Sequence, residues 1–316
     1  NAHFSNNSTY INVFNTAPTH VSLDGCTGIL FNNCGFSHNN TVPAIYTMPR
    51  NGIKSNNASY SVIGGTTFSN LMRGIDAYNT AGNNNTFYVS NAIFTDNEVG
   101  INTTNINNFS ILLNAFYLGG NKLGGSFHYG IKNWYGSGFR IEENNFLPSA
   151  NQINTVQKLG IWVSNTGTAA NQIYKNTFSG ITYGNYANGQ NRDDGADGII
   201  QGLQYLCNKN LNGVINDFTV VGKAKNLGIR LNQGTMAYPA GNEFVSTGLS
   251  NSHFYNNTLD PIKYYYKSGA TNQTPTLFNA TKVIPIPASG TNTCPSLICT
   301  PPCDFIVLAR PDVEQL

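Results

Sequence analysis

The segment from Arg192 to Gly198 holds the densest group of residues whose side chains could do chemistry. It places the carboxylates of Asp193, Asp194 and Asp197 within five residues, in a stretch whose glycines predict a loop. Carboxylate oxygens are the ligands that Ca²⁺ prefers, so this loop is a candidate calcium site, and no other cofactor is indicated. Two neighbouring acids are also what a glycosidase needs for acid–base catalysis. The simplest interpretation is an acidic, solvated turn that leads into the next strand.

A second candidate is an aromatic segment inside a predicted loop at 119–138. His128, Tyr129, Trp134 and Tyr135 lie close together there. Aromatic side chains offer a flat apolar face with a polar rim, which suits stacking on sugar rings. These four residues are therefore candidate ligand-binding residues for a polysaccharide or cell-surface glycan. Packing of the segment against the rest of the fold accounts for the same composition, and both interpretations stay open.

The cysteines bear on the compartment in which the protein works. Cys294, Cys299 and Cys303 cluster in a proline-rich tail, and such a cluster in an Asn-rich, Lys-poor chain favours an oxidising environment. We expect one local disulfide between two of these three residues. A zinc site is disfavoured, because no histidine lies nearby and paired C-x-x-C spacing is absent. Cys207 stands alone and is interpreted as a buried free thiol.

Two short repeats organise the chain that must position these residues. They recur at steps of mostly about 20 to 33 residues, a period that indicates stacked units rather than a single globule. The first repeat is the pair Gly-Ile, which begins at Gly28, Gly52, Gly74, Gly100, Gly130, Gly160, Gly180, Gly198 and Gly228. The second is Asn-x-Phe, which begins at Asn114, Asn144, Asn176, Asn216 and Asn242.

Short strands and Asn-rich turns separate the repeats, and no segment shows a sustained helical period. One coil of three strands fits the repeat length, and stacked coils would place Phe over Phe, Ile over Ile and Asn over Asn. The glycine before each Ile is expected to adopt a left-handed turn conformation, and the repeated Asn to tolerate one. This pattern resembles the right-handed parallel β-helix family. The resemblance implies an all-β solenoid of about nine to ten rungs.

The resemblance covers residues 1–267. From Ser268 the repeats stop, and seven of the 13 prolines follow, which cannot donate to a strand ladder. Residues 268–316 are therefore predicted to form an extended tail or a cap over the open end of the solenoid, leading on to further domains.

Carbohydrate-active members of this fold give the acidic segment a second context. The pair Asp193-Asp194 is similar to part of the polygalacturonase signature, although the Gly-His-Gly of that family is absent and Arg230 stands without the Lys of its Arg-x-Lys. Pectate-lyase-like members use Ca²⁺ with a basic residue beside it. The resemblance makes Asp193, Asp194, Asp197 and Arg230 weak catalytic candidates. The five histidines occur singly, and a triad is recognised by geometry, so none is predicted.

Composition narrows the classes of function. Only 10% of residues are charged and the net charge is +2, which argues against nucleic acid as a partner. No run of 18 apolar residues is present, so no membrane-spanning helix is expected. The Asn-rich, charge-poor texture with a Cys-Pro-Ser tail resembles large bacterial surface proteins exported by the type IX secretion system. That resemblance implies an extracellular or cell-surface location.

The expected function is that of a non-catalytic module of such a protein: a scaffold, an adhesin or a secretion-system cargo that also contacts a glycan. Its expected partners are other domains of the same polypeptide, a surface glycan, and secretion or anchoring machinery. The alternative is a polysaccharide lyase or glycoside hydrolase. Because the chain has 15 acidic residues and one acidic cluster, the convergent groove that an enzyme needs is less favoured.

Overall fold

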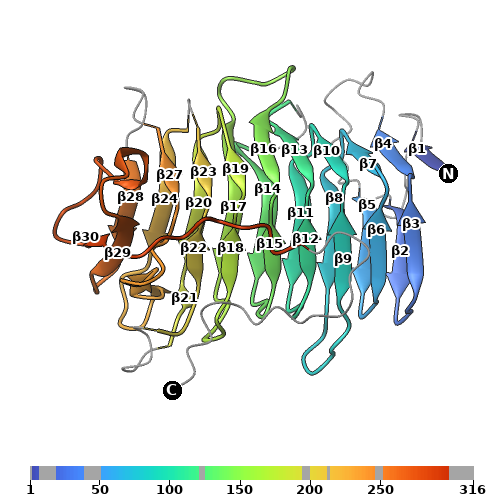
Figure 1. Ribbon diagram of the computed structural model, residues 1–316. Helices are drawn as coiled ribbons and strands as arrows, with labels where there is room; N and C mark the ends of the chain where they lie inside the picture. The colour runs from blue at the N-terminus through green and yellow to red at the C-terminus, as the bar shows by residue number, and fades with distance from the viewer. Residues whose placement is uncertain are drawn as a thin grey trace.

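The computed structural model describes residues 2–6, 19–38, 51–120, 125–193, 200–211, 214–245 and 252–298. The chain is a parallel β-helix, as the repeats predict, and its sheets run side by side along a rod (Figure 1). Each of the three long sheets takes every third strand of the chain as far as β20, after which the extra strands β21, β25 and β26 intervene. Throughout, a strand pairs in parallel with its equivalent one coil away. Two of these sheets hold nine strands among the described residues, in agreement with the predicted number of rungs.

Three sheets form the walls, and we call them sheets I, II and III in the order in which each coil passes through them. Sheet I consists of β2 (Thr19–Asp24), β5 (Asn51–Asn56), β8 (Arg73–Tyr78), β11 (Val99–Thr104), β14 (Phe127–Trp134), β17 (Gln157–Ser164), β20 (Tyr183–Asn188), β24 (Asn216–Val221) and β28 (Ser252–Asn257). Sheet II consists of β3 (Ile29–Asn32), β6 (Tyr60–Ile63), β9 (Phe87–Ser90), β12 (Ser110–Leu112), β15 (Arg140–Glu142), β18 (Gln172–Tyr174) and β22 (Gln204–Leu206).

Sheet III consists of β1 (His3–Asn6), β4 (Gly35–His38), β7 (Thr67–Ser69), β10 (Ile93–Thr95), β13 (Ala115–Leu118), β16 (Asn145–Pro148), β19 (Thr177–Phe178), β23 (Lys209–Asn210) and β27 (Glu243–Phe244). Two smaller sheets complete the C-terminal coils. They are formed by β21 (Gln190–Asn191) with β25 (Gly228–Ile229), and by β26 (Asn232–Gln233), β29 (Ile262–Lys267) and β30 (Val283–Ala288). One short 3-10 helix, η2, spans Thr271–Gln273.

The interior consists of columns of like side chains, as predicted. Six phenylalanines of sheet III stack with ring centroids 4.8 to 5.0 Å apart and are at most 1% exposed: Phe36, Phe68, Phe94, Phe116, Phe146 and Phe178. Five isoleucines of sheet I stand in register on successive strands: Ile53, Ile75, Ile101, Ile131 and Ile161. Burial of each such side chain contributes about 1.5–3 kcal/mol, so these columns supply much of the driving force for stacking the coils.

An asparagine ladder marks the turn between sheets II and III. Its members are buried: Asn114, Asn144, Asn176, Asn208 and Asn242. From the second member on, each side-chain oxygen accepts hydrogen bonds from the backbone amide and the side-chain amide of the member before it. The left-handed residue of this turn is not the ladder asparagine but the residue before it. Leu113, Glu143, Lys175 and Cys207 have φ between 54° and 58°. The left-handed position of this turn is thus held by residues other than glycine. The ladder supplies hydrogen bonds to the buried polar groups of the turn.

The expectation of a left-handed conformation is met by Gly28, Gly180 and Gly228, whose φ values are 75°, 65° and 111°. It is wrong for the glycines of the repeat that lie in sheet I, which serve close packing instead. Gly52, Gly74, Gly100, Gly130 and Gly160 are absent from the residues with positive φ. A Cβ on Gly100 would lie 2.8 Å from Cδ1 of Phe116 and 2.6 Å from the carbonyl oxygen of Gly130. Glycine is thus required because the phenylalanine ring of the same coil rests directly on the backbone.

The residue types in these columns change between β20 and β24, near the C-terminal end of the rod. Asn210 stands in register with Phe178, and Phe218 stands in register with Asn185. The Asn-x-Phe match at Asn216 is therefore not a ladder member, because it lies in β24 of sheet I, and Asn208 takes its place. Asp217 occupies the position that glycines hold on earlier coils, since it lies between the registered pairs Tyr183–Asn216 and Asn185–Phe218 and so stands opposite Gly184.

Strand pairing continues past residue 267. Strand β30 contains Pro285 and Pro287 and pairs in parallel with β29, so the proline-rich segment begins with one more strand of the solenoid. Proline is tolerated there because β30 is the last strand of its sheet and its second edge needs no donor. Because proline has no N–H group, the outer edge of β30 cannot donate to a further strand at these two positions. This is expected for the last strand of a sheet.

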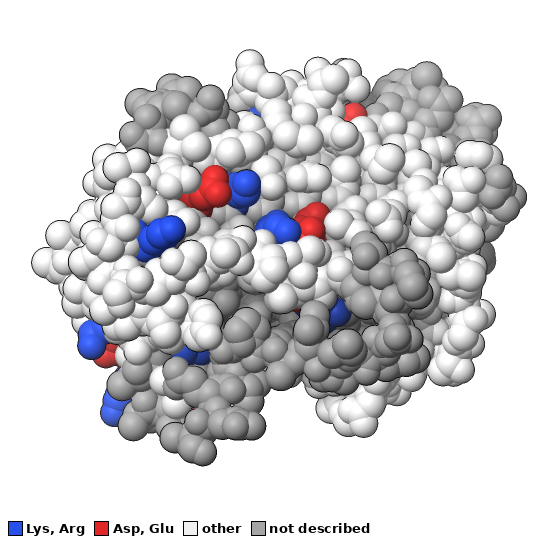
Figure 2. Space-filling model, in the orientation of Figure 1, with Lys and Arg blue, Asp and Glu red and all other residues white. Residues whose placement is uncertain are grey.

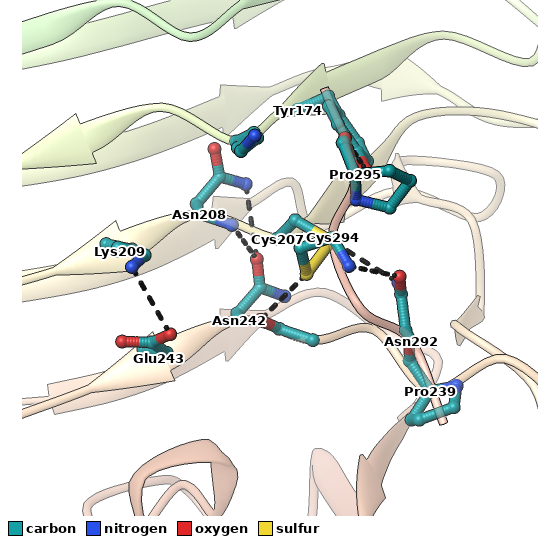
Figure 3. The surroundings of a disulfide bond; sticks show 12 residues. Tyr174, Cys207, Asn208, Lys209, Pro239, Asn242, Glu243, Asn292, Cys294 and Pro295 are labelled. Carbon is teal, nitrogen blue, oxygen red and sulfur yellow. Dashed lines mark hydrogen bonds and ion pairs between the residues drawn. A yellow bond between two sulfur atoms is a disulfide. The ribbon is translucent and has the colours of Figure 1, made fainter. Parts of the chain in front are cut away.

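The residues after β30 turn back along the outside of sheet II (Figure 1). Cys294 forms a disulfide with Cys207, and Asn292 Nδ2 donates to the Pro239 oxygen over 3.0 Å (Figure 3). Further along, the Tyr174 hydroxyl donates to the Pro295 oxygen over 2.8 Å, and Arg140 Nη2 donates to the Leu297 oxygen over 3.2 Å. We call residues 289–298 the strap.

The disulfide corrects two expectations. Cys207 is not a free thiol, and Cys294 does not pair with Cys299 or Cys303, both of which lie outside the described residues. The two bonded residues are 87 positions apart in sequence, but their Cα atoms lie 5.5 Å apart because the strap returns across the coil that holds Cys207. Sequence proximity therefore gave the wrong partner for Cys294, while a pair between Cys299 and Cys303 stays a prediction.

Charge contributes little to the surface of the rod. In Figure 2 most of the described surface is white, and several of the few basic side chains lie beside acidic ones. Ion pairs between neighbouring coils include Lys175 with Glu143 and Lys209 with Glu243, each at 3.6 Å. Exposed pairs of this kind contribute about 0–1 kcal/mol. Stacking and the asparagine ladder, rather than surface charge, hold the coils together.

Candidate functional site

The aromatic segment predicted to lie in a loop forms strand β14 of sheet I. Residues 127–134 pair with β11 on one side and with β17 on the other. A strand presents alternate side chains to opposite faces, so this segment divides between the interior and the outer surface. Tyr129, Lys132 and Trp134 are partly exposed, whereas Ile131 and Asn133 are buried.

The outward side chains of β14 meet those of β17 and β20. Trp134 and Trp162 lie with ring centroids 4.6 Å apart, and Tyr183 and Tyr186 with centroids 5.7 Å apart. The ammonium group of Lys132 lies between 4.9 and 5.5 Å from the ring centroids of Tyr129, Trp134 and Trp162. We call Tyr129, Lys132, Trp134, Trp162, Tyr183 and Tyr186 the aromatic face. Trp162 is only 9% exposed, so this surface offers mainly the rings of Tyr129, Trp134, Tyr183 and Tyr186 together with a cationic donor.

Polar and aromatic groups continue in a row along the rod axis. One outward position of sheet I is occupied on five successive strands by Asp76, Asn102, Lys132, Trp162 and Tyr186. Successive strands of a sheet lie about 4.8 Å apart, so these side chains form a continuous strip. A long, linear ligand can contact several of its members at once.

Charged groups at the N-terminal end of the aromatic face perturb one another. Arg73 Nη1 pairs with Asp76 Oδ2 at 2.7 Å, and Asp76 Oδ1 accepts from Asn102 Nδ2 over 2.8 Å. Burial raises the pKa of Glu98, although Arg73 and Lys132 oppose that shift. Burial and the charge of Arg73 lower the pKa of Lys132, and Glu98 opposes this. Groups with opposite perturbations on one surface are typical of functional sites.

His128 does not belong to this surface, which corrects its place among the ligand-binding candidates. Its side chain is fully buried, and burial lowers its pKa to about 4. It is therefore neutral at pH 7 and inaccessible to a ligand on the outer face. Tyr135, the fourth candidate, is 52% exposed and lies beside Trp134, with ring centroids 6.1 Å apart. Tyr129, Trp134 and Tyr135 thus come together, and His128 does not join them.

The structure describes only the first part of the acidic segment. Asp193 is described, and its backbone oxygen accepts from Arg192 Nη1 over 3.3 Å, but Asp194 and Asp197 lie outside the described residues. Among the residues that the structure describes, no three His, Cys, Asp or Glu side chains are grouped closely enough to hold a metal ion. The calcium site therefore stays a prediction. Arg230 is 7% exposed and lines a cavity beneath the strap.

Sequence reasoning missed Lys132, Trp162, Tyr183 and Tyr186. The signal was present in part, because the residue after each in-register Gly-Ile pair faces outward, and Lys132 and Trp162 hold that position on neighbouring coils. Tyr186 holds the same position where the repeat is altered to Gly-Asn, so the repeat alone does not reveal it.

No family model, curated protein or solved structure matches the chain. Inferences about its function therefore rest on the fold and on the geometry of the aromatic face. Among the described residues, no helix has the length and apolarity needed to cross a lipid bilayer.

Proposed function

We propose that this chain is a non-catalytic, glycan-contacting module of an extracellular or cell-surface bacterial protein, and that it contacts the glycan through the aromatic face. The observation that carries the proposal is the arrangement of Tyr129, Trp134 and Trp162 around Lys132 on adjacent strands. Sugar rings stack on flat aromatic surfaces, and an ammonium group donates to their hydroxyl or carboxylate oxygens. The strip along sheet I suits an extended polysaccharide more than a compact ligand.

The location rests on composition and on the cross-link. A disulfide between Cys207 and Cys294 is typical of proteins that fold in an oxidising compartment. The Asn-rich, charge-poor texture resembles cargo of the type IX secretion system, and in that setting a rigid rod acts as a scaffold or adhesin. Other domains of the same polypeptide and the secretion or anchoring machinery are its proposed partners.

Binding to a panel of bacterial and plant polysaccharides tests the proposal. For any polysaccharide that binds, Trp134→Ala should weaken the affinity about tenfold or more, equivalent to about 1.4 kcal/mol of lost contact. Tyr88→Ala is the matched control, because Tyr88 is 37% exposed on β9 of sheet II. If no polysaccharide binds, or if both variants bind as well as the wild type, the aromatic face is not a glycan site.

A second candidate function is polysaccharide lysis by elimination, favoured by the perturbed pKa values of Lys132 and Glu98. A lysine whose pKa is lowered can accept a proton from the carbon beside a uronic carboxylate. The electron pair left on that carbon forms a carbon–carbon double bond as the adjacent C–O bond to the next sugar breaks, and the departing oxygen takes a proton from water. Release of unsaturated sugar products, measured by ultraviolet absorbance, distinguishes turnover from binding. Product release that disappears in Lys132→Met would replace the non-catalytic proposal with this one.

A further inference from the structure

A cavity of about 510 Å³ lies between sheet II and the strap, on a different sheet from the aromatic face. Its walls come from β18 and β22, from the connections at 168–170 and 200–201, and from residues 230–239 of the following coil. Pro295 and Leu297 of the strap close one side. Cavities of 300–1,000 Å³ are the usual size of sites for small organic ligands.

The strap forms a fixed roof over this cavity. The disulfide between Cys207 and Cys294 attaches the strap to the turn after β22 (Figure 3). Asn292 of the strap donates from Nδ2 to the oxygen of Pro239, which itself lines the cavity. A covalent bond and a hydrogen bond therefore hold the roof and one wall together, so the space between them is a lasting feature of the fold.

Polar groups on the walls are already engaged within the protein. The Tyr174 hydroxyl donates to the Pro295 oxygen over 2.8 Å, and Thr235 Oγ1 accepts from the Tyr238 amide over 3.0 Å. Arg230 is the one charged residue among the described lining residues, and it also takes part in an interaction within the protein. The charge on this wall is therefore not waiting for a ligand to neutralise it.

Apolar side chains make up most of the remaining lining. Leu206 contributes from sheet II and Leu297 from the strap, and Ile200 and Tyr238 are 52% and 56% exposed. A ligand that covers this apolar surface gains free energy from its burial. A charged ligand would lose its hydration in the cavity without finding a free partner of opposite charge, and that loss is costly.

We propose that this cavity is a binding site for a small, neutral, apolar organic molecule, held by packing between the side chains of sheet II and those of the strap. Selection against charged molecules follows from the engaged polar groups. The site is separate from the glycan contact on sheet I, so the failure of either proposal leaves the other standing.

Two fluorescent dyes with nearly the same apolar body test the proposal. N-Phenyl-1-naphthylamine is neutral, and 1-anilinonaphthalene-8-sulfonate carries a negative charge. The native protein should bind the neutral dye at least tenfold more tightly than the sulfonate dye. Equal affinity for the two dyes, a preference for the sulfonate dye, or no binding of the neutral dye would overturn the proposal.

A cavity-filling variant tests whether the neutral dye occupies this space. Ala169 is half-buried and lines the cavity, so Ala169→Trp should fill part of it and weaken binding of the neutral dye at least tenfold. Ala81→Trp, on an exposed turn outside the lining, is the control and should bind the dye as the wild type does. Undiminished binding by Ala169→Trp would contradict the proposal.

NMR of the wild-type protein locates the dye without any substitution. Backbone amide signals of Leu206 and Leu297 should shift when N-phenyl-1-naphthylamine is added, because both residues line the cavity. The indole signals of Trp134 and Trp162 should stay in place, because both tryptophans lie on sheet I. Shifts of the indole signals with unchanged signals from Leu206 and Leu297 would place the dye on the aromatic face and overturn the proposal.

Discussion

Asp217 is a carboxylic acid in the interior of the rod. It is 2% exposed, and burial raises its pKa from the ordinary 3.8 to about 8. It sits where earlier coils have glycine, one coil after Asn210 takes the position of a stacked phenylalanine. Asn185, fully buried, replaces an isoleucine one coil earlier. Two successive coils therefore exchange apolar packing for polar side chains, and the Asp217 carboxyl group stays protonated at neutral pH.

The stability of the protein should fall with pH because of this residue. Between about pH 4 and pH 8 the unfolded chain ionises Asp217 while the folded chain keeps it neutral, so stabilisation that is complete below pH 4 is lost as the pH rises. The free energy of unfolding of the wild type, minus that of Asp217→Asn, should decrease by up to about 1.4 kcal/mol per pH unit in this range. Urea unfolding at several pH values measures it. A difference independent of pH would mean that Asp217 ionises normally in the folded protein.

At the scale of elements, the sequence predicted the sheets better than the turns. Period and residue type were enough for the coil, since Phe recurs on the inner face of sheet III and Ile on that of sheet I over successive coils. The loop expected at 119–138 is instead largely strand β14, because its Gly-Ile pair continues the column of sheet I. The Gly-Ile pairs at Gly28 and Gly228 begin strands in other sheets, so a two-residue match could not fix register.

The packing role of the repeated glycines gives an element-scale prediction. In Gly100→Ala the new methyl group must displace the ring of Phe116 or the backbone of β14, so the free energy of unfolding should fall by about 1–3 kcal/mol. Gly125→Ala is the control, since no atom lies within 4 Å of the position that its new methyl group would occupy and its φ is not in the left-handed range. It should change stability by less than about 0.5 kcal/mol. Equal stabilities of the two variants would contradict this role for Gly100.

For the whole molecule, the strap links the last coils to the middle of the rod. It contacts residues of β15, β18 and the turn after β22, and it runs against the direction in which the coils were laid down. Sequence could indicate that the tail departs from the repeat, but its path depends on contacts between residues more than 80 positions apart. The same distance hid the partner of Cys294 and the cavity that contains Arg230.

Removing the cross-link should destabilise the protein and loosen the strap. The double variant Cys207→Ser/Cys294→Ser should lower the free energy of unfolding by roughly 2–5 kcal/mol, because the unfolded chain regains the freedom that an 87-residue closure removes. Denaturant unfolding under oxidising conditions measures this. Cys26→Ser, at a free cysteine, is the control and should have little effect. An unchanged midpoint in the double variant would show that the strap is held without the disulfide.

The proposed glycan contact can be tested most directly with the two tryptophans of the chain, because Trp134 and Trp162 are the only ones and both lie on the aromatic face. Their indole N–H groups give two resolved signals in a proton–nitrogen NMR spectrum. On addition of a binding polysaccharide we expect both indole signals to shift, together with backbone amides of β14 and β17. A polysaccharide that binds and shifts other amides while leaving both indole signals in place would contradict the aromatic face as the site of contact.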